Sequence, residues 1–136
     1  MVKLIMGLKG TGKTKKLVDL VRSAVEEAHG DVVCIEKDKN LTYDIPYTAR
    51  LIHAGEYGIN SNVLLRGFIS GLHAGNYDIT HVFIDNFYKM LDDRSEDAVG
   101  DLLDWMADFS ARENVEFTIS ATVEPSTVGP RISKYF

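Results

Sequence analysis

The stretch Gly7-Leu8-Lys9-Gly10-Thr11-Gly12-Lys13-Thr14 decides the fold of this chain. It holds a glycine, four variable residues and then Gly-Lys-Thr, which is the spacing of a phosphate-binding loop. A chain of 136 residues shows this pattern by chance roughly once in a few hundred cases. The apolar run Val2–Met6 predicts a short buried strand before it, and Lys13–Ala28 predicts a helix after it. The pattern therefore stands at a strand-to-helix turn, which is where such a loop binds phosphate.

Each residue type in this loop suits an anionic ligand. The three glycines let the backbone adopt conformations that a Cβ disfavours, so that successive N–H groups point inward. The N-terminus of the following helix adds the positive end of its dipole. Lys13 supplies a point charge for the β- and γ-phosphates, and the Thr14 hydroxyl suits Mg²⁺. We therefore predict that residues 7–14 bind a nucleoside triphosphate, with a catalytic role for Lys13 and a metal-binding role for Thr14.

Length and charge restrict the other possibilities. A chain of 136 residues suits one domain, which we expect to span residues 1–136. The net charge is −5 and there is no run of basic residues, so a nucleic-acid partner is not favoured. The one cysteine, Cys34, lies in an apolar run, where we expect it to be a small buried side chain. No apolar run approaches a membrane span and no signal peptide is evident, so we expect a cytoplasmic location.

The remaining apolar runs alternate between strand and helix patterns. The first strand, the helix after it and the run Val32–Ile35 form a βαβ unit, for which a right-handed crossover is expected. Gly30, just past the helix, is a residue typical of a left-handed helix end. Further elements are predicted as a short strand within Thr48–His53, a helix from Ser61 to about His73, a strand at His81–Asp85, a helix from Ser95 to about Arg112, a strand at Val115–Ala121 and an irregular tail over residues 123–136.

Asp85 is the second residue that points to phosphate chemistry. It ends the apolar run Val82–Ile84, and the carboxyl end of a buried parallel strand lies at the sheet edge where ligands bind. A carboxylate at that edge can hold Mg²⁺ beside the hydroxyl of Thr14. We therefore predict Thr14 and Asp85 as metal ligands, with Mg²⁺ and ATP as the bound groups.

These two motifs together resemble the P-loop NTPase superfamily. Gly7–Thr14 matches Walker A, and Val82–Asp85 is similar to Walker B. The strand at Val32–Ile35 separates the two motifs, an order similar to that of the RecA-like and AAA-like branch. The resemblance implies an α/β three-layer α/β/α sandwich with a mostly parallel sheet. It also implies that the strand at Val115–Ala121 is inserted between the motif strands, with Ser120 or Thr122 as a polar sensor.

The chain departs from the P-loop families that it resembles in ways that bear on mechanism. The guanine-reading Asn-Lys-x-Asp sequence of translational-type GTPases is absent, so ATP is favoured over GTP. Leu8 stands where partitioning ATPases carry a signature lysine. Many RecA-like proteins place a glutamate directly after the Walker B aspartate, but here that residue is Asn86, a poor base. Glu36, at the end of the second strand, is similar in place to the glutamate of RecA-type recombinases, and whether it acts in catalysis or is a loop carboxylate stays open.

Three functions remain open on this basis. The first is a Mg²⁺-dependent ATPase in which Glu36, or Asn86 with help, orients the attacking water. Because no arginine is plainly placed to stabilise the transition state, a neighbouring copy or a protein partner would supply one, and Arg112 and Arg131 are candidates for that role. The second is a nucleotide-dependent switch or assembly module with negligible hydrolysis. The third is a kinase for a small hydroxyl-bearing, nucleoside-type substrate.

Overall fold

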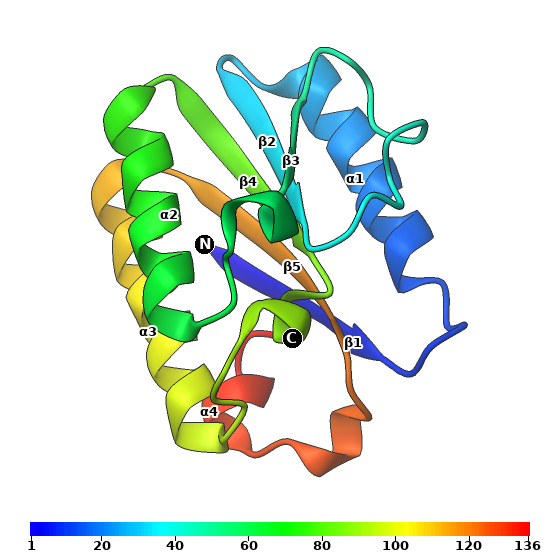
Figure 1. The fold of residues 1–136 in the computed structure, drawn as a ribbon, viewed down its shortest axis with the longest axis vertical. Coiled ribbons are helices and arrows are strands. Elements are labelled where there is room, and N and C mark those ends of the chain that lie inside the picture. The colour runs from blue at the N-terminus through cyan, green and yellow to red at the C-terminus, as the bar shows by residue number, and fades with distance from the viewer.

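A five-stranded sheet forms the centre of the molecule, as Figure 1 shows. The computed structural model describes all residues from 1 to 136. Every neighbouring pair of strands is parallel, and the spatial order is β1-β5-β4-β2-β3. The strands are β1 (Val2–Gly7), β2 (Asp31–Glu36), β3 (Arg50–His53), β4 (Ile79–Asp85) and β5 (Glu116–Thr122).

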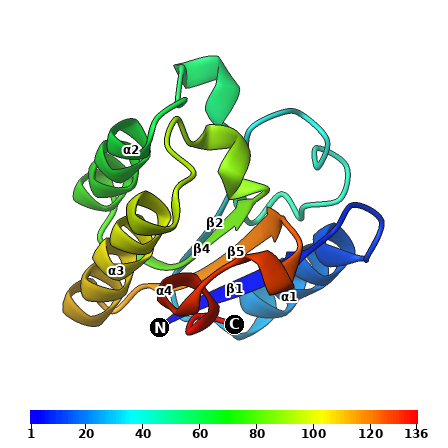
Figure 2. The same ribbon diagram turned by 90° about the horizontal axis from the view of Figure 1, so that it is seen from below.

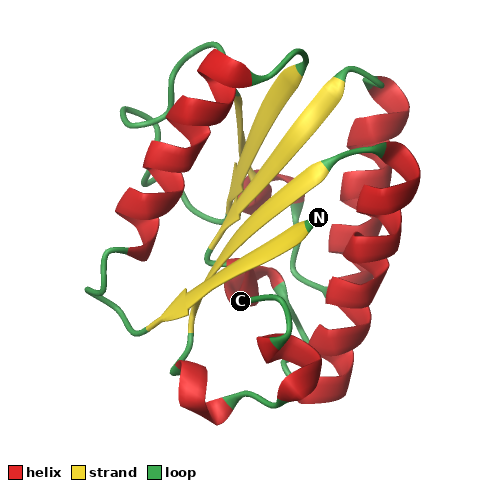
Figure 3. Cartoon of the chain, turned by 180° about the vertical axis from the view of Figure 1, so that it is seen from behind, coloured by secondary structure: helices red, strands yellow, loops and turns green.

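Helices cover both faces of this sheet. Helix α1 (Lys13–Glu27) lies on one face, and α2 (Asn62–Gly75) and α3 (Glu96–Glu113) lie on the other, as Figures 2 and 3 show from two directions. Ser61 and Ser95 precede α2 and α3 as predicted, and each hydroxyl accepts a hydrogen bond from a backbone N–H of the first turn. The predicted α/β three-layer sandwich is therefore confirmed.

Apolar side chains fill the space on both sides of the sheet. Leu17 and Val21 of α1 pack with Cys34 on one side, and Leu65 and Leu103 lie in the larger cluster on the other. Burial raises the pKa of the Cys34 thiol, so this side chain stays protonated within the core. The central strands are buried on both faces, which explains why their sequences are continuous apolar runs.

The parallel register aligns the carboxyl ends of the strands at one edge of the sheet. Gly7 lies opposite Thr122, and Glu36 lies opposite both Asp85 and His53. β5 lies between β1 and β4, which is the place predicted for the Val115–Ala121 strand. Because ligands bind at the carboxyl ends of strands in open α/β sheets, this edge is where a functional site is expected.

The C-terminal tail differs from the irregular segment that the sequence indicated. It contains a 3-10 turn (Pro125–Thr127) and the short helix α4 (Pro130–Ser133). Ile132 of α4 is only 2% exposed, and the carbonyl of Tyr135 accepts a hydrogen bond of 2.8 Å from the N–H of Leu4. The tail therefore packs beside α3 and covers part of the outer edge of β1.

Gly30 also has a different role from the one predicted. It is not among the residues with positive φ, so it does not end α1 in a left-handed conformation. A Cβ at this position would instead lie 2.2 Å from the carbonyl oxygen of Asp78. Glycine is required here because the backbones before β2 and β4 approach each other closely.

Candidate functional site

The loop between β1 and α1 depends on three glycines. Gly10 and Gly12 have φ angles of 86° and 82°, a region that side chains with a Cβ rarely adopt. A Cβ on Gly7 would lie 2.7 Å from the hydroxyl oxygen of Thr11. The loop conformation that exposes backbone N–H groups at the start of α1 is therefore available to this sequence and closed to most others.

Lys13 lies inside the loop. Its side chain is largely buried, with the residue 8% exposed, and its ammonium donates a hydrogen bond of 3.0 Å to the carbonyl of Leu8. The Thr11 hydroxyl donates to the same carbonyl at 2.7 Å. The ammonium is thus held at the centre of the loop by a neutral acceptor. A phosphate oxygen would be a stronger acceptor for this ammonium than the neutral carbonyl, because it carries negative charge.

Asp85 lies at the end of β4, beside Thr14 at the start of α1. Its Oδ1 is 3.4 Å from the Thr14 hydroxyl and accepts a hydrogen bond of 2.6 Å from the Ser120 hydroxyl. Asp85 is 4% exposed and Ser120 is fully buried. A buried carboxylate is costly without donors, and Ser120 supplies one. The structure therefore brings together the two predicted metal ligands and the first of the two predicted sensor residues.

Asn86 connects Asp85 to the end of β5. Its backbone is left-handed, with φ 50° and ψ 52°, and its N–H donates to the Ser120 hydroxyl at 2.9 Å. The side-chain oxygen accepts a hydrogen bond of 2.6 Å from the Thr122 hydroxyl, and the amide nitrogen lies 3.4 Å from Asp85 Oδ2. Both β5 residues proposed as sensors thus contact the Asp85–Asn86 pair. The amide of Asn86 is fixed in orientation by these contacts.

Glu36 ends β2 at the same edge, but its carboxylate anchors the loop that follows. It is 2% exposed and accepts hydrogen bonds from the backbone N–H groups of Asn40, at 2.8 Å, and Leu41, at 3.1 Å. The Nδ1 of His53 lies 3.4 Å from the second carboxylate oxygen. Burial raises the pKa of the Glu36 carboxyl, while the two backbone N–H groups act in the opposite direction. The structure gives Glu36 a clear role in holding this loop.

A cavity of about 540 Å³ opens between the phosphate loop and the turn after β4. No aspartate or glutamate and no hydrophobic residue lines it, and its walls include Thr14 and Asn86. Its charged side chains are Lys9, Lys13, Lys15 and Lys89. A cavity lined by four ammonium groups attracts an anion with several charges. The shape and charge of this cavity, hereafter the lysine cavity, therefore suit a polyphosphate.

Sequence reasoning missed three residues of the lysine cavity. Lys15 follows the phosphate loop directly, so its position next to residues 7–14 was the available signal for a phosphate-binding role. Lys89 lies in the 3-10 turn Phe87–Met90, four positions after Asp85, so a basic residue shortly after the metal-side strand was the available signal. Asn40 reaches the cavity through the course of the loop after β2, which the sequence does not indicate.

A second cavity of about 440 Å³ lies on the other side of the phosphate loop. Gly12 and Lys13 line both cavities. The second cavity is partly apolar, and its walls also include Ile5, Met6 and Pro125. A cationic region and a partly apolar region therefore meet at the phosphate loop.

The two candidate arginines lie away from the lysine cavity. Arg131 donates hydrogen bonds to two aspartates of α3, Asp101 at 2.7 Å and Asp104 at 2.9 Å. It also forms an ion pair with Asp97 of that helix. Arg112 lies over the ring of Phe109, also in α3. Neither side chain is placed to contact a ligand bound in its own chain. Arg131 in particular serves to fix the tail on α3.

The residues at this edge fit Mg²⁺. The hydroxyl of Thr14 and the carboxylate of Asp85 are oxygen donors lying side by side, and oxygen is the ligand type that Mg²⁺ takes. No cluster of three or more His, Cys, Asp or Glu side chains is placed to hold a metal ion. Mg²⁺ binds proteins through one or two carboxylates together with water and phosphate oxygens.

The fold and this site define a P-loop nucleotide-binding protein. The parallel sheet carries the glycine loop on β1, the aspartate on β4 and an inserted strand between them. Residues 3–136 match the sequence profile described as "ATPase family associated with various cellular activities (AAA)". The chain belongs to this AAA family of ATPase-like P-loop domains. A search of curated proteins returned no match, and none of the helices has the length and apolarity needed to cross a bilayer.

Proposed function

We propose that this chain hydrolyses ATP in a Mg²⁺-dependent reaction at the lysine cavity. The observation that carries the proposal is the placement of Thr14 and Asp85, 3.4 Å apart, at the edge of a cavity that holds four lysines and no carboxylate. Such a cavity binds the phosphates, and the oxygen pair would hold Mg²⁺, which neutralises charge on them when bound. This arrangement supports a nucleoside triphosphate over a monophosphate because it provides more positive charge than one phosphate needs.

Hydrolysis transfers the γ-phosphoryl group to water. The oxygen of water attacks the γ-phosphorus, and the bond from that phosphorus to the bridging oxygen breaks, leaving its electron pair on ADP. One proton of the water stays on the inorganic phosphate, and the other is released to solvent. Lys13, held at the centre of the loop, is the residue proposed to contact the β- and γ-phosphates. The backbone N–H groups of the loop contact the other phosphate oxygens.

Asn86 is the residue that we propose to orient the water. It lines the lysine cavity, whereas Glu36 does not, and the Glu36 carboxylate is engaged by two backbone N–H groups and His53. Thr122 and Asp85 hold the amide of Asn86 in place. An amide positions water without accepting its proton, so we expect turnover to be slow. Glu36 then contributes by holding the loop that carries Asn40.

The second cavity is the proposed site of the adenine ring. Ile5, Met6 and Pro125 provide apolar contacts for a flat ring, and Glu124 provides a hydrogen-bond acceptor for an exocyclic amine. The second cavity adjoins the lysine cavity at the phosphate loop, since Gly12 and Lys13 line both. A ligand with an anionic chain and an aromatic base matches the two regions together.

A nucleotide-dependent switch is the second candidate. The lining of the lysine cavity contains no carboxylate that could act as a base, which favours binding over rapid hydrolysis. The switch differs from the ATPase in one measurable respect. It binds ATP with Mg²⁺ but releases no phosphate above the rate of a variant that lacks the water-orienting residue.

Phosphate release and nucleotide binding, measured together, test the proposal. Lys13→Ala should lose both, Asn86→Ala should lose phosphate release while keeping most binding, and Glu36→Gln should keep measurable release. Lys3→Ala, a change of an exposed lysine on β1, is the matched control and should behave as wild type. Wild-type binding without phosphate release would favour the switch. If wild type does release phosphate and Asn86→Ala releases it at the same rate, the role of Asn86 is refuted.

A further inference from the structure

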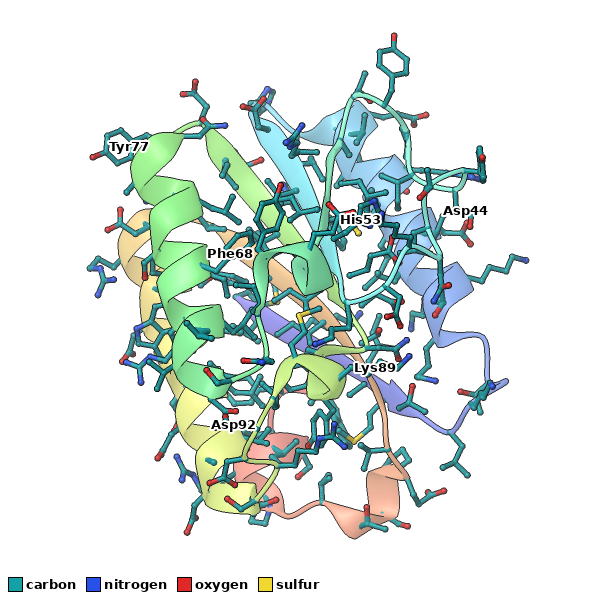
Figure 4. All side chains as sticks on the ribbon, viewed as in Figure 1. Asp44, His53, Phe68, Tyr77, Lys89 and Asp92 are labelled. Atoms are coloured by element: carbon teal, nitrogen blue, oxygen red, sulfur yellow. The ribbon has the colours of Figure 1, made fainter.

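The lysine cavity has one ammonium group that the phosphate loop does not supply. Lys9, Lys13 and Lys15 belong to the loop and the start of α1, but Lys89 comes from the turn after β4, on the opposite wall. Figure 4 shows the labelled Lys89 between this turn and α1. A ligand in the cavity would thus lie between positive charges on two sides.

The turn that carries Lys89 is firmly placed. Phe87 and Met90 on either side of it are fully buried in the core, and the N–H of Lys89 donates to the carbonyl of Asn86 at 3.0 Å. The position of the Lys89 backbone is therefore fixed relative to Asp85 and Asn86. A long flexible side chain on a fixed base can reach a ligand without rearrangement of the fold.

The present partner of Lys89 is weakly held. Its Nζ lies 3.4 Å from Asp38 Oδ2, and both side chains are about half exposed, at 52% and 55%. Exposed pairs of this kind contribute little, typically about 0–1 kcal/mol. A terminal phosphate carries more charge than one carboxylate and lies in a cavity with three further lysines. Exchange of Asp38 for a phosphate oxygen is therefore favourable.

No arginine takes this place. None lines the lysine cavity, and Arg131 is bound to aspartates of α3. Transfer of the γ-phosphoryl group leaves negative charge on the terminal oxygens, and a cation there accelerates the reaction. Lys89 is the ammonium on the wall opposite the loop, next to the proposed water-orienting residue Asn86.

We propose that Lys89 contacts the terminal phosphate of the bound triphosphate from within the same chain, releasing Asp38 as it does so. This inference rests on the proposed function. It assigns to the chain itself the positive charge that a neighbouring copy or partner would otherwise supply. A monomer then discriminates ATP from ADP, because only ATP has the phosphate that Lys89 reaches.

The test compares affinities for a non-hydrolysable ATP analogue and for ADP, each with Mg²⁺, by calorimetry. Lys89→Met should weaken analogue binding by about 10- to 100-fold, the loss of one charged hydrogen bond, and ADP binding by less than about 3-fold. Lys89→Arg keeps the charge and should restore most of the preference. Asp38→Asn, which removes the competing carboxylate, should strengthen analogue binding by about 2- to 5-fold.

The control is Lys39→Ala, one residue from Asp38. Lys39 pairs with Glu56 at 2.5 Å and does not line the cavity, so its loss should change neither affinity. An equal loss of analogue and ADP binding in Lys89→Met would overturn the inference and leave the proposed function intact. Wild-type protein that binds neither nucleotide would overturn both. Thermal unfolding of each variant separates these results from a failure to fold.

Discussion

Replacement of Ser120 by alanine tests the geometry of the site most directly. The hydroxyl of Ser120 is fully buried, donates to Asp85 Oδ1 at 2.6 Å and accepts from the N–H of Asn86 at 2.9 Å. Loss of a hydrogen bond to a charged group costs about 1.5–3 kcal/mol, and an unsatisfied buried N–H costs about 1–3 kcal/mol. Because a single oxygen serves both bonds and nearby groups relax, the two costs do not add fully. We expect Ser120→Ala to lower the free energy of unfolding by about 2–4 kcal/mol.

Urea and thermal unfolding measure this loss. At about 4 °C per kcal/mol for a chain of this size, Tm should fall by about 8–16 °C. Thr118→Ala is the matched control, since Thr118 is partly exposed and lies two residues earlier on the same strand. The free energy of unfolding of Thr118→Ala should stay within about 0.5 kcal/mol of the wild-type value. If Ser120→Ala is no less stable than Thr118→Ala, the hydroxyl does not hold Asp85, and the reasoning is wrong.

The same substitution has a consequence for the metal. Asp85 would keep its carboxylate but lose the donor that fixes its orientation. Loss of such a supporting hydrogen bond typically weakens metal affinity by about 10- to 100-fold. Nucleotide binding should therefore require more Mg²⁺ in Ser120→Ala than in wild type. A titration of Mg²⁺ at constant ATP measures this shift, and an unchanged midpoint would exclude Asp85 as the ligand that Ser120 positions.

Two further predictions concern the rest of the fold. Gly30→Ala places a Cβ 2.2 Å from the carbonyl oxygen of Asp78. We therefore expect the free energy of unfolding, measured by urea denaturation, to fall by about 1–3 kcal/mol. Hydrogen bonds from Tyr135 and Arg131 lower the pKa of the Asp104 carboxyl from 3.8 to about 2. Because this folded-state pKa is below the unfolded value, the stabilisation is present above about pH 4 and is lost as the pH falls towards 2. Arg131→Ala should therefore melt below wild type at pH 7, with a difference that shrinks between pH 4 and pH 2.

The sequence was sufficient to predict the parts of the site that depend on local structure. The conformation of the phosphate loop follows from its glycines and from the strand and helix that flank it. Asp85 could be placed at the ligand edge because a buried parallel strand must end there. The place of β5 between β1 and β4 came from the resemblance to known P-loop proteins, since hydrophobic patterns do not say which strands are neighbours.

The sequence could not predict what depends on contacts between distant segments. Glu36 was correctly placed at the end of a strand, but the direction of its carboxylate follows from the backbone N–H groups of the next loop. The place of Lys89 in the lysine cavity depends on how the turn after β4 lies relative to the phosphate loop. Gly30 was given a local role, whereas the actual constraint is a backbone 48 positions away, at Asp78.

The position of β5 connects the phosphate site to the C-terminal tail. Ser120 and Thr122 hold Asp85 and Asn86, and the chain continues within three residues to Glu124 and Pro125, which line the second cavity. Beyond them, the tail is fixed to α3 by Arg131 and to β1 by its backbone. A ligand that occupied both cavities would therefore contact one continuous segment at its phosphates and at its base. The wall of the second cavity and the tail that packs on α3 therefore belong to the same stretch of chain.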